Sequence, residues 1–212
     1  QTICFFFIVS VQDTYQTVEG SAEGLFKDRG SKFIAFIFHV EKEEEIKETI
    51  QHIKKEHFSA RHHCYAYRLG YYGEKYRAND DGEPSGTAGK PIHGQLLSHN
   101  LTNTLIVVVR YFGGTLLGVS GLINAYKNAA ADAILNASIV TRIIENNYRL
   151  KFGYPLQNAV MKIIKDEQLE VVSASYELDC TLEIKVRINK TDTVTEKLAT
   201  IIGLTVEPLH CE

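Results

Sequence analysis

The sequence predicts an α+β protein with two domains, and three observations support this. Apolar residues alternate with a period of two in some segments and recur at spacings of three and four in others, so both strands and helices are expected. Leu105 to Val109 is an unbroken apolar run rich in β-branched residues, which is typical of a buried central strand. From Ser138 onwards the predicted elements follow the order βαββαβ, the ferredoxin-like arrangement. We therefore expect an N-terminal extension at residues 1–14, a first domain at 15–137 and a ferredoxin-like domain at 138–212.

Length and composition limit the classes of protein that fit. The 212 residues suffice for one large or two small domains, and the formal net charge of −3 argues against a protein that coats nucleic acid through bulk charge. Any such binding must use a local patch. The cysteines form no CxxC pair, so reduced thiols in a cytoplasmic protein are expected rather than a zinc ribbon or a disulfide framework. They are Cys4, Cys64, Cys180 and Cys211.

The apolar run from Ile3 to Val11 is too short to span a bilayer, and no basic residues precede it as they would in a signal peptide. We expect an extra strand or an extension there and no membrane association.

In the first domain, Leu25 to Val40 carries bulky and β-branched residues on both sides of a turn near Asp28 to Ser31, and it predicts two strands. The period then changes. From Glu41 to His57, isoleucines at spacings of four and three form one apolar stripe, and acidic residues precede basic ones, as the helix dipole prefers. This segment is expected to be a helix.

Arg61 to Leu69 (RHHCYAYRL) predicts a strand whose alternation places His62 and Cys64 on one face and His63 on the other. Adjacent strand residues point in opposite directions, so the histidines are more readily explained by packing or hydrogen bonding than by metal binding. No cofactor is expected. Cys64 has no indicated partner that would activate it as a nucleophile.

The segment from Lys54 to Arg77 holds six Lys or Arg residues against two Glu, with five tyrosines interleaved. Cations for phosphates and rings for stacking are what a surface for single-stranded nucleic acid would use. Tyrosines are also common in plain sheets, so part of this set is equally well explained as core. The tyrosines are Tyr65, Tyr67, Tyr71, Tyr72 and Tyr76.

Asp80 to Ile92 (DDGEPSGTAGKPI) must be a loop, because its glycines and prolines disfavour a regular helix or central strand. Acids stand at one end and Lys90 near the other, so backbone N–H groups and an ammonium could hold an anion. A phosphate-binding P-loop is excluded, because Pro84 stands where the first glycine is needed and Pro91 follows the lysine.

A second glycine-rich segment follows the predicted central strand. Arg110-Tyr111-Phe112-Gly113-Gly114 leads through Gly118 to a small, alanine-rich helix at Gly121 to Leu135. A buried strand that feeds a glycine turn and then a helix can aim amides at an anion. The glycine spacing does not match the dinucleotide fingerprint GxGxxG. On the helix, core packing is expected for every residue except Asn124 and Lys127.

The remaining elements complete the βαββαβ order. Asp192 is expected to cap the last helix, and Cys180 to Ile188 alternates most clearly of all the strands. The other predicted elements are a short helix from Pro91 to about Asn100, a strand at Asn146 to Phe152, a helix at Pro155 to Lys165, a strand at Glu170 to Leu178, a helix that ends at Gly203 and a strand at Leu204 to Leu209.

Four motifs together closely resemble the IMPACT/YigZ family. They are GSKFIA at Gly30 to Ala35, ARHHCYAYRLG at Ala60 to Gly70, YRANDDGEPSGTAGKPI at Tyr76 to Ile92 and VVVRYFGGTLLG at Val107 to Gly118. The likeness is strong from about Tyr15 to Leu135. The C-terminal unit is similar to the bacterial branch's second domain in order and size only.

The resemblance implies a left-handed βαβ domain similar to domain IV of elongation factor G, followed by a domain like that factor's domain V. It also implies a role with RNA or the ribosome, or a protein partner in translation control. Where the family usually has arginine in a GGLVRAY segment, this chain has Asn124, which leaves Arg110 and Lys90 to hold an anion.

Three interpretations of the two loops stay open. In the first, the two loops converge on one positively polarised hollow, and the chain is a binding protein that holds phosphate with cations, loop amides and loop polar groups. In the second, it is an enzyme acting on a small phosphorylated or peptide-like substrate, with Asp80, Asp81 or Glu83 as the acid or base. In the third, these acids bond loop amides and pair with arginines to fix the fold. The expected ligand-binding residues are Lys90, Arg110, Arg61, Arg68, Arg77, Ser85, Thr87, Asp81, Glu83, Gly113 and Gly114.

Overall fold

The computed structural model describes residues 12–209, and these divide into two compact units. The first spans Tyr15–Arg142, and the second comprises residues 143–209 together with 12–14. The predicted α+β class, with two sheet-containing units, is confirmed. The apolar run at Ile3 to Val11, with Cys4 and Cys211, lies outside the described residues.

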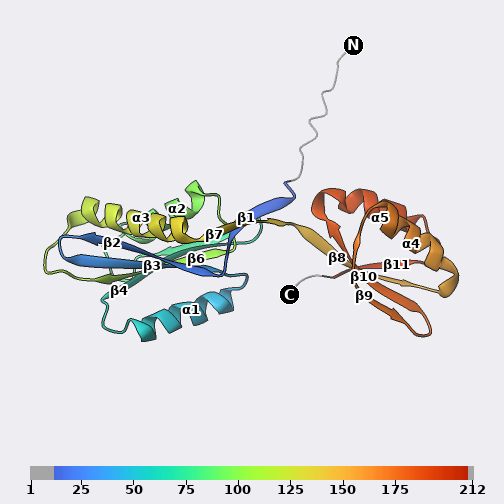
Figure 1. Ribbon diagram of the computed structural model, residues 1–212, viewed down its shortest axis with the longest axis horizontal. Helices are drawn as coiled ribbons and strands as arrows, with labels where there is room; N and C mark the ends of the chain where they lie inside the picture. Colours follow the sequence, from blue (N-terminus) through green and yellow to red (C-terminus); the bar gives the residue numbers. More distant parts are fainter. Residues whose placement is uncertain (1–11, 210–212) are drawn as a thin grey trace, which may run out of the picture. The chain divides into compact units, whose positions relative to one another are not determined.

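A five-stranded antiparallel sheet forms the centre of the first unit. Its order is β2-β3-β6-β4-β5, so the predicted central strand β6 lies in the middle (Figure 1). All five residues of the run Leu105 to Val109 are fully buried, as their β-branched and apolar character predicts. The strand bounds are β2 Ser21–Asp28, β3 Ser31–His39, β4 His62–Leu69, β5 Lys75–Asn79 and β6 Thr104–Tyr111.

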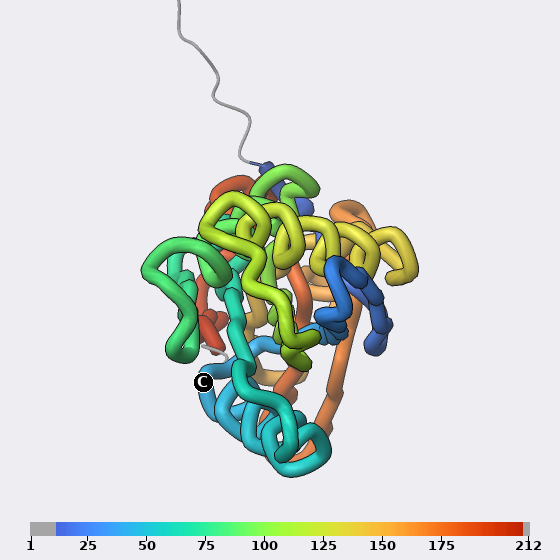
Figure 2. The backbone as a smooth tube through the Cα atoms, turned by 90° about the vertical axis from the view of Figure 1, so that its left-hand side faces the viewer, coloured from blue at the N-terminus to red at the C-terminus, as the bar shows by residue number. Residues whose placement is uncertain are grey.

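Helices cover both faces of this sheet. Helix α1, Glu43–Glu56, lies on one face with Ile46 and Ile53 inward, whereas α2, Gly89–Ser98, and α3, Gly118–Asn136, lie on the other (Figures 1 and 2). The predicted alternation along β4 is confirmed. Cys64 and Ala66 join the core under α2 and α3, whereas Tyr65, Tyr67 and Leu69 pack in the core under α1.

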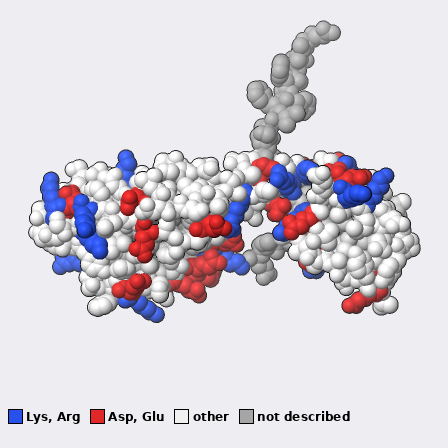
Figure 3. Space-filling model, in the orientation of Figure 1, with Lys and Arg blue, Asp and Glu red and all other residues white. Residues whose placement is uncertain are grey.

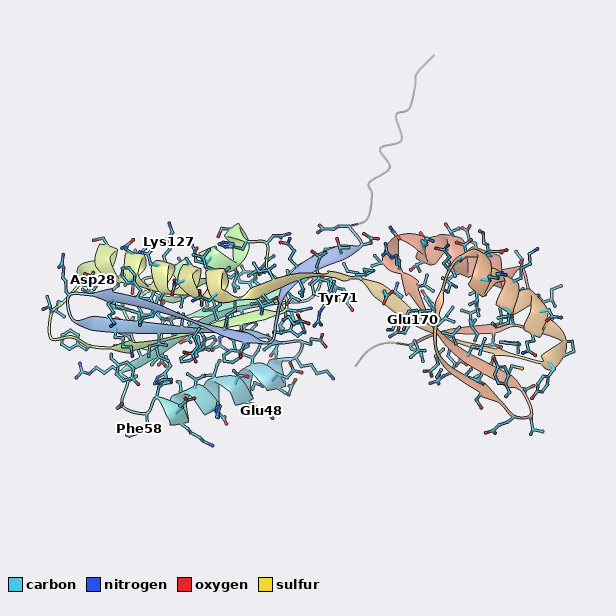
Figure 4. All side chains as sticks on the ribbon, viewed as in Figure 1. Asp28, Glu48, Phe58, Tyr71, Lys127 and Glu170 are labelled. Atoms are coloured by element: carbon cyan, nitrogen blue, oxygen red, sulfur yellow. The ribbon has the colours of Figure 1, made fainter. Side chains whose placement is uncertain are left out.

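Close contact between α3 and the sheet depends on small residues. A methyl group added at Gly24 on β2 would lie 2.2 Å from the backbone nitrogen of Ala133, so only glycine lets the strand approach the helix this closely. Asn124 and Lys127 are exposed, as expected, and Lys127 lies on the outer face of α3 (Figure 4). Ile123 and Leu135 are exposed as well, at 39% and 78%, which corrects the expectation that every other residue of this helix packs in the core.

Three short strands were not predicted. Strand β1, Thr14–Glu19, pairs with β7, Ser138–Ile143, so the first unit extends a few residues past Ser138. Strand β5 follows a turn whose glycines, Gly70 and Gly73, both have positive φ.

The second unit is a four-stranded antiparallel sheet of order β11-β8-β10-β9. Its core contains Val160 and Ile164 of α4 with Val194 and Leu198 of α5, together with inward residues of the strands. The bounds are β8 Glu145–Phe152, α4 Gln157–Asp166, β9 Glu170–Tyr176, β10 Cys180–Arg187, α5 Thr191–Ala199 and β11 Thr205–Leu209.

The last helix differs from its prediction at both ends. Helix α5 begins at Thr191, so Asp192 lies inside its first turn and makes no side-chain cap, which corrects the expected N-cap. The helix ends at Ala199 rather than at Gly203, whose φ of +91° places it in a later turn. Among the described residues, no helix is both long and apolar enough to cross a membrane.

Candidate functional site

The two glycine-rich loops meet at a buried ion pair. Arg110 stands near the end of β6, and its Nη1 donates a hydrogen bond of 2.6 Å to Oε1 of Glu83 in the loop after β5. Both side chains are almost fully buried, at 7% and 3% exposed. Segments about thirty residues apart in sequence are therefore held together by one strong, directional contact.

This ion pair continues into a buried polar chain. The Tyr126 hydroxyl on α3 donates to the same Glu83 oxygen at 2.8 Å, and Cys64 Sγ on β4 lies 3.3 Å from the tyrosine oxygen. Burial raises the pKa of both the Cys64 thiol and the Tyr126 phenol. Both groups therefore stay protonated at neutral pH, which argues against Cys64 as a nucleophile.

Asp80 organises the central loop from inside. Its carboxylate accepts hydrogen bonds from the backbone nitrogens of Gly86 at 2.9 Å, Ala88 at 3.0 Å and Gly89 at 2.8 Å. Burial alone would raise the pKa of Asp80, but these three amides and nearby Lys90 outweigh burial and lower it. The loop amides expected to hold a phosphate are already occupied by an anion of the protein itself.

Other loop groups are also engaged within the protein. The Thr87 hydroxyl donates to the carbonyl of Pro84 at 2.6 Å and is buried, and Ser85 is exposed away from the pocket lining. The Gly113 amide donates to the Ser31 hydroxyl at 3.1 Å. A methyl group on Gly113 would lie 1.9 Å from the backbone of Gly30, so this glycine permits a close approach of two loops.

Asp81 likewise serves the fold. It accepts a hydrogen bond of 2.7 Å from the backbone nitrogen of His63 and one of 3.2 Å from Lys54. Burial would raise the pKa of Asp81, but these two donors lower it. All three acids proposed as an acid or base thus have structural partners, which favours the third interpretation for them.

A pocket of about 350 Å³ opens beside the Glu83–Arg110 pair. Its polar wall comes from β4 and the two loops, and its apolar wall comes from the segment between β6 and α3 and from the first turns of α3. The lining residues are Arg61, His62, Glu83, Pro84, Arg110, Phe112, Leu116, Leu117, Gly118, Val119 and Leu122.

Strand register explains why the polar residues gather here. His62 and Arg110 are direct partners across the β4–β6 ladder, and Phe33 on β3 is the partner of Arg110 on its other side. Side chains of paired residues project from the same face of a sheet, in this case the face covered by α3. The Arg110 guanidinium accordingly lies over the rings of Phe33 and Phe112, at 5.5 and 5.6 Å from their centroids.

The hydrogen bonding of His62 fixes which ring nitrogen faces outward as an acceptor. Its Nδ1 lies 2.8 Å from the carbonyl oxygen of Asp81, and a carbonyl can only accept, so Nδ1 carries a proton. In the neutral ring, Nε2 is then an acceptor. This nitrogen is 3.9 Å from Glu83 Oε1, too far for a hydrogen bond, and remains available to a ligand in the pocket.

Two further features favour an anion at this pocket. Helix α3 begins at Gly118 with no side-chain cap and no acidic residue in its first turn, so the positive end of its dipole is not neutralised locally. The exposed Arg61 adds a cation at the rim, whereas the charge of Arg110 is balanced by Glu83.

The other predicted cations lie elsewhere. Lys90 is exposed on the first turn of α2, and Arg77 is exposed on the edge strand β5; neither lines the pocket. Arg68 is buried and donates to the carbonyls of Leu101 and Tyr72, so its role is structural. Arg68 is therefore withdrawn as a ligand-binding residue, and so are Thr87 and the amide of Gly113.

Eight of the pocket residues were not among the predicted ligand-binding residues: His62, Pro84, Phe112, Leu116, Leu117, Gly118, Val119 and Leu122. His62 was expected to serve packing or hydrogen bonding, and its hydrogen bond to the Asp81 carbonyl confirms the second role. Its place in the pocket was missed because its partner across the sheet cannot be read from one strand. No local signal separates the two leucines of GGTLLG, because Leu116 is 82% exposed and its neighbour Leu117 is buried. Within residues 12–209, no cluster of three or more His, Cys, Asp or Glu side chains could hold a metal ion.

Comparison with known proteins gives consistent matches. A family model described as the Impact N-terminal domain matches residues 29–134, which include the whole pocket. IMPACT family member YvyE of Bacillus subtilis (strain 168) is 34% identical over 183 residues, covering 86% of this chain and 84% of the relative. IMPACT family member YigZ of Escherichia coli (strain K12) is 30% identical over 171 residues, covering 80% of this chain and 84% of the relative.

The fold has a solved counterpart. A structure described as the crystal structure of an hypothetical protein aligns with a TM-score of 0.68 and 25% sequence identity, covering 95% of this chain and all of the other.

Proposed function

The chain belongs to the IMPACT family, and from this premise we propose that it is a binding protein for single-stranded RNA, acting in the cytoplasm close to the translation machinery. The single observation that supports this most is the pocket beside the Glu83–Arg110 pair. It combines cations, the start of an uncapped helix and an exposed aromatic ring. These are the groups that bind a phosphate and an unstacked base.

The contacts differ from those expected from sequence alone. Arg61 and the first amides of α3 take the place of the central-loop amides, which Asp80 occupies. Arg110, held by Glu83, supplies a rigid planar group rather than a free positive charge, because the carboxylate balances it. The loop's role is then to position this arginine.

The charge distribution favours the first unit over the second as the RNA-binding unit. On the open sheet face of the second unit the cations are paired with carboxylates, as in Arg149–Glu183, Lys151–Glu207 and Lys185–Glu170. Acidic residues gather over α1, at the lower edge of the first unit in Figure 3, so that face would repel a phosphate chain. The pocket lies on the opposite face of the sheet.

The proposed ancestry of the two units rests on topology. The βαββαβ order and the sheet order β11-β8-β10-β9 support a ferredoxin-like assignment for the second unit. We further propose that the units correspond to domains IV and V of elongation factor G, which would suit a ribosomal partner. Alternatively, the chain would associate with the translation machinery by binding a protein partner that acts in translation control.

RNA binding is tested by fluorescence anisotropy with the full chain and a labelled oligouridylate. We expect the affinity to fall as salt rises from roughly 50 to 200 mM, because each phosphate contact releases counterions from the RNA. Arg61→Ala should weaken binding several-fold and reduce the salt slope by about 0.7. Arg77→Ala removes the same charge outside the pocket and should change neither the affinity nor the salt slope. Binding that is absent at low salt, or insensitive to salt, would contradict the proposal.

A further inference from the structure

We infer that the pocket holds one unstacked nucleotide of the bound strand, with its base against Phe112 and its phosphate on Arg61 and the first turn of α3. This inference rests on the proposed function and specifies the ligand of that site. The volume of about 350 Å³ lies near the lower end of the roughly 300–1,000 Å³ typical of small-molecule sites. A pocket of this size suits a single nucleotide better than a stacked strand.

Apolar surface in the pocket is arranged for a flat ring. Phe112 is 44% exposed even though the Arg110 guanidinium lies against it, so part of the ring remains open for stacking. Leu116 and Val119 stand at 82% and 60% exposed on the adjoining segment, where they would cover the edges of a base. Together with buried Leu122 they make one wall of the pocket apolar. Base stacking on such a ring tolerates any sequence, because every base has a π-face.

The floor of the pocket provides one hydrogen-bond acceptor. His62 Nε2 accepts in the neutral ring, because Nδ1 donates to the Asp81 carbonyl at 2.8 Å. Arg110 is paired with Glu83, and its Nε is buried rather than open to the pocket. An N–H group on a base complements the His62 acceptor, and the ring of a base covers the apolar wall, which inorganic phosphate does not. The pocket therefore favours a nucleotide over inorganic phosphate.

The phosphate position follows from the remaining charges. Arg61 is exposed at the rim, and the N–H groups of the first turn of α3 are not capped by any side chain. Glu83 lies on the opposite, buried side. Arg110 balances its charge, and Arg110 and Tyr126 both donate hydrogen bonds to its Oε1. A phosphate at the rim therefore meets positive groups and avoids the only pocket carboxylate.

The experiment is a calorimetric or NMR titration of the full chain with mononucleotides, measured beside the matching nucleosides, ribose 5-phosphate and inorganic phosphate. We expect the mononucleotides to bind on the order of tenfold more tightly than any of these fragments, because base and phosphate are both recognised. Phe112→Ala should weaken mononucleotide binding on the order of tenfold. Val119→Glu should weaken it more than Val119→Gln, because the two replacements have nearly the same shape and only the glutamate adds a negative charge near the phosphate.

The results separate this inference from the proposed function. If oligouridylate binds and none of Phe112→Ala, Val119→Glu and His62→Ala weakens it, RNA uses another surface and the nucleotide pocket is overturned. If ribose 5-phosphate binds as tightly as the mononucleotides, the base is not recognised and the inference is likewise wrong. If neither oligonucleotide nor mononucleotide binds at low salt, both proposals fail. Glutamate is favourable in the first turn of a helix, so Val119→Glu is expected to fold, and loss of folding does not explain weaker binding.

Discussion

Glu83→Gln is expected to destabilise the first unit by about 3–5 kcal/mol, the cost of breaking a buried ion pair by removing one partner. The substitution keeps the shape of the side chain and an oxygen that can accept from Tyr126. It removes the charge that faces Arg110, whose side chain is only 7% exposed, so a guanidinium is left buried without a counter-ion. Hydrogen exchange of the β6 amides in the full chain measures this stability for the first unit alone.

The matched control is Glu41→Gln. Glu41 lies 3.1 Å from His39 and 3.5 Å from Arg142, but its side chain is 56% exposed. Surface pairs of this kind contribute about 0–1 kcal/mol, so little change is expected. A loss of less than about 1 kcal/mol in Glu83→Gln would show that Arg110 finds water or another partner, and that the pair does not fix the loops. The double variant Glu83→Gln, Arg110→Met should recover part of the loss.

Asp80→Ala is expected to cost about 3 kcal/mol, because three backbone N–H groups lose their charged acceptor at once. Asp80→Asn should cost about half as much, since its amide keeps one accepting oxygen but replaces the other with a donor that faces an N–H group. Urea denaturation at pH 7, with the β6 amides as the probe, measures both. The control is Asp132→Asn, which affects a single bond to the backbone nitrogen of Leu25.

The same variants give a dependence on pH with a defined sign. The pKa of Asp80 is below its ordinary 3.8 in the folded protein, so the unfolded chain binds the proton more readily. The stabilisation is therefore present above pH 3.8 and is lost as the pH falls through the lower folded pKa. We expect the difference in stability between the natural chain and Asp80→Asn to shrink in acid. A difference that stays constant down to pH 2 would mean that the carboxylate charge is not what holds the loop.

Most of the fold could be predicted because its signals are local. The unbroken run of Leu105 to Val109 predicts a central strand, and alternation along β4 predicts which residues meet α3. Strands β5 and β7 could not be predicted in this way. Four of the five β5 residues are exposed, and no residue of β7 is buried, so neither strand carries an apolar pattern and both depend on pairing with a neighbour.

The site was predictable only in part, and for a different reason. The convergence of the two loops was expected and Arg110 was placed in it, but the partners of the loop amides depend on how the loop closes. A carboxylate six to nine residues before these amides competes with any external anion, and composition does not reveal which anion is bound. The contribution of His62 depends on its register with Arg110 across β4 and β6, which no single segment encodes.

Whether RNA binds at the pocket can be determined by a two-dimensional NMR titration of the isotope-labelled full chain with a short oligouridylate at low salt. We expect shifts of the Phe112 amide, in the segment that leads into α3, and of the Val119 and Ser120 amides in the first turn of α3, together with the side-chain signals of His62. Shifts confined to β8 and β10 of the second unit, with the pocket amides unchanged, would contradict this expectation.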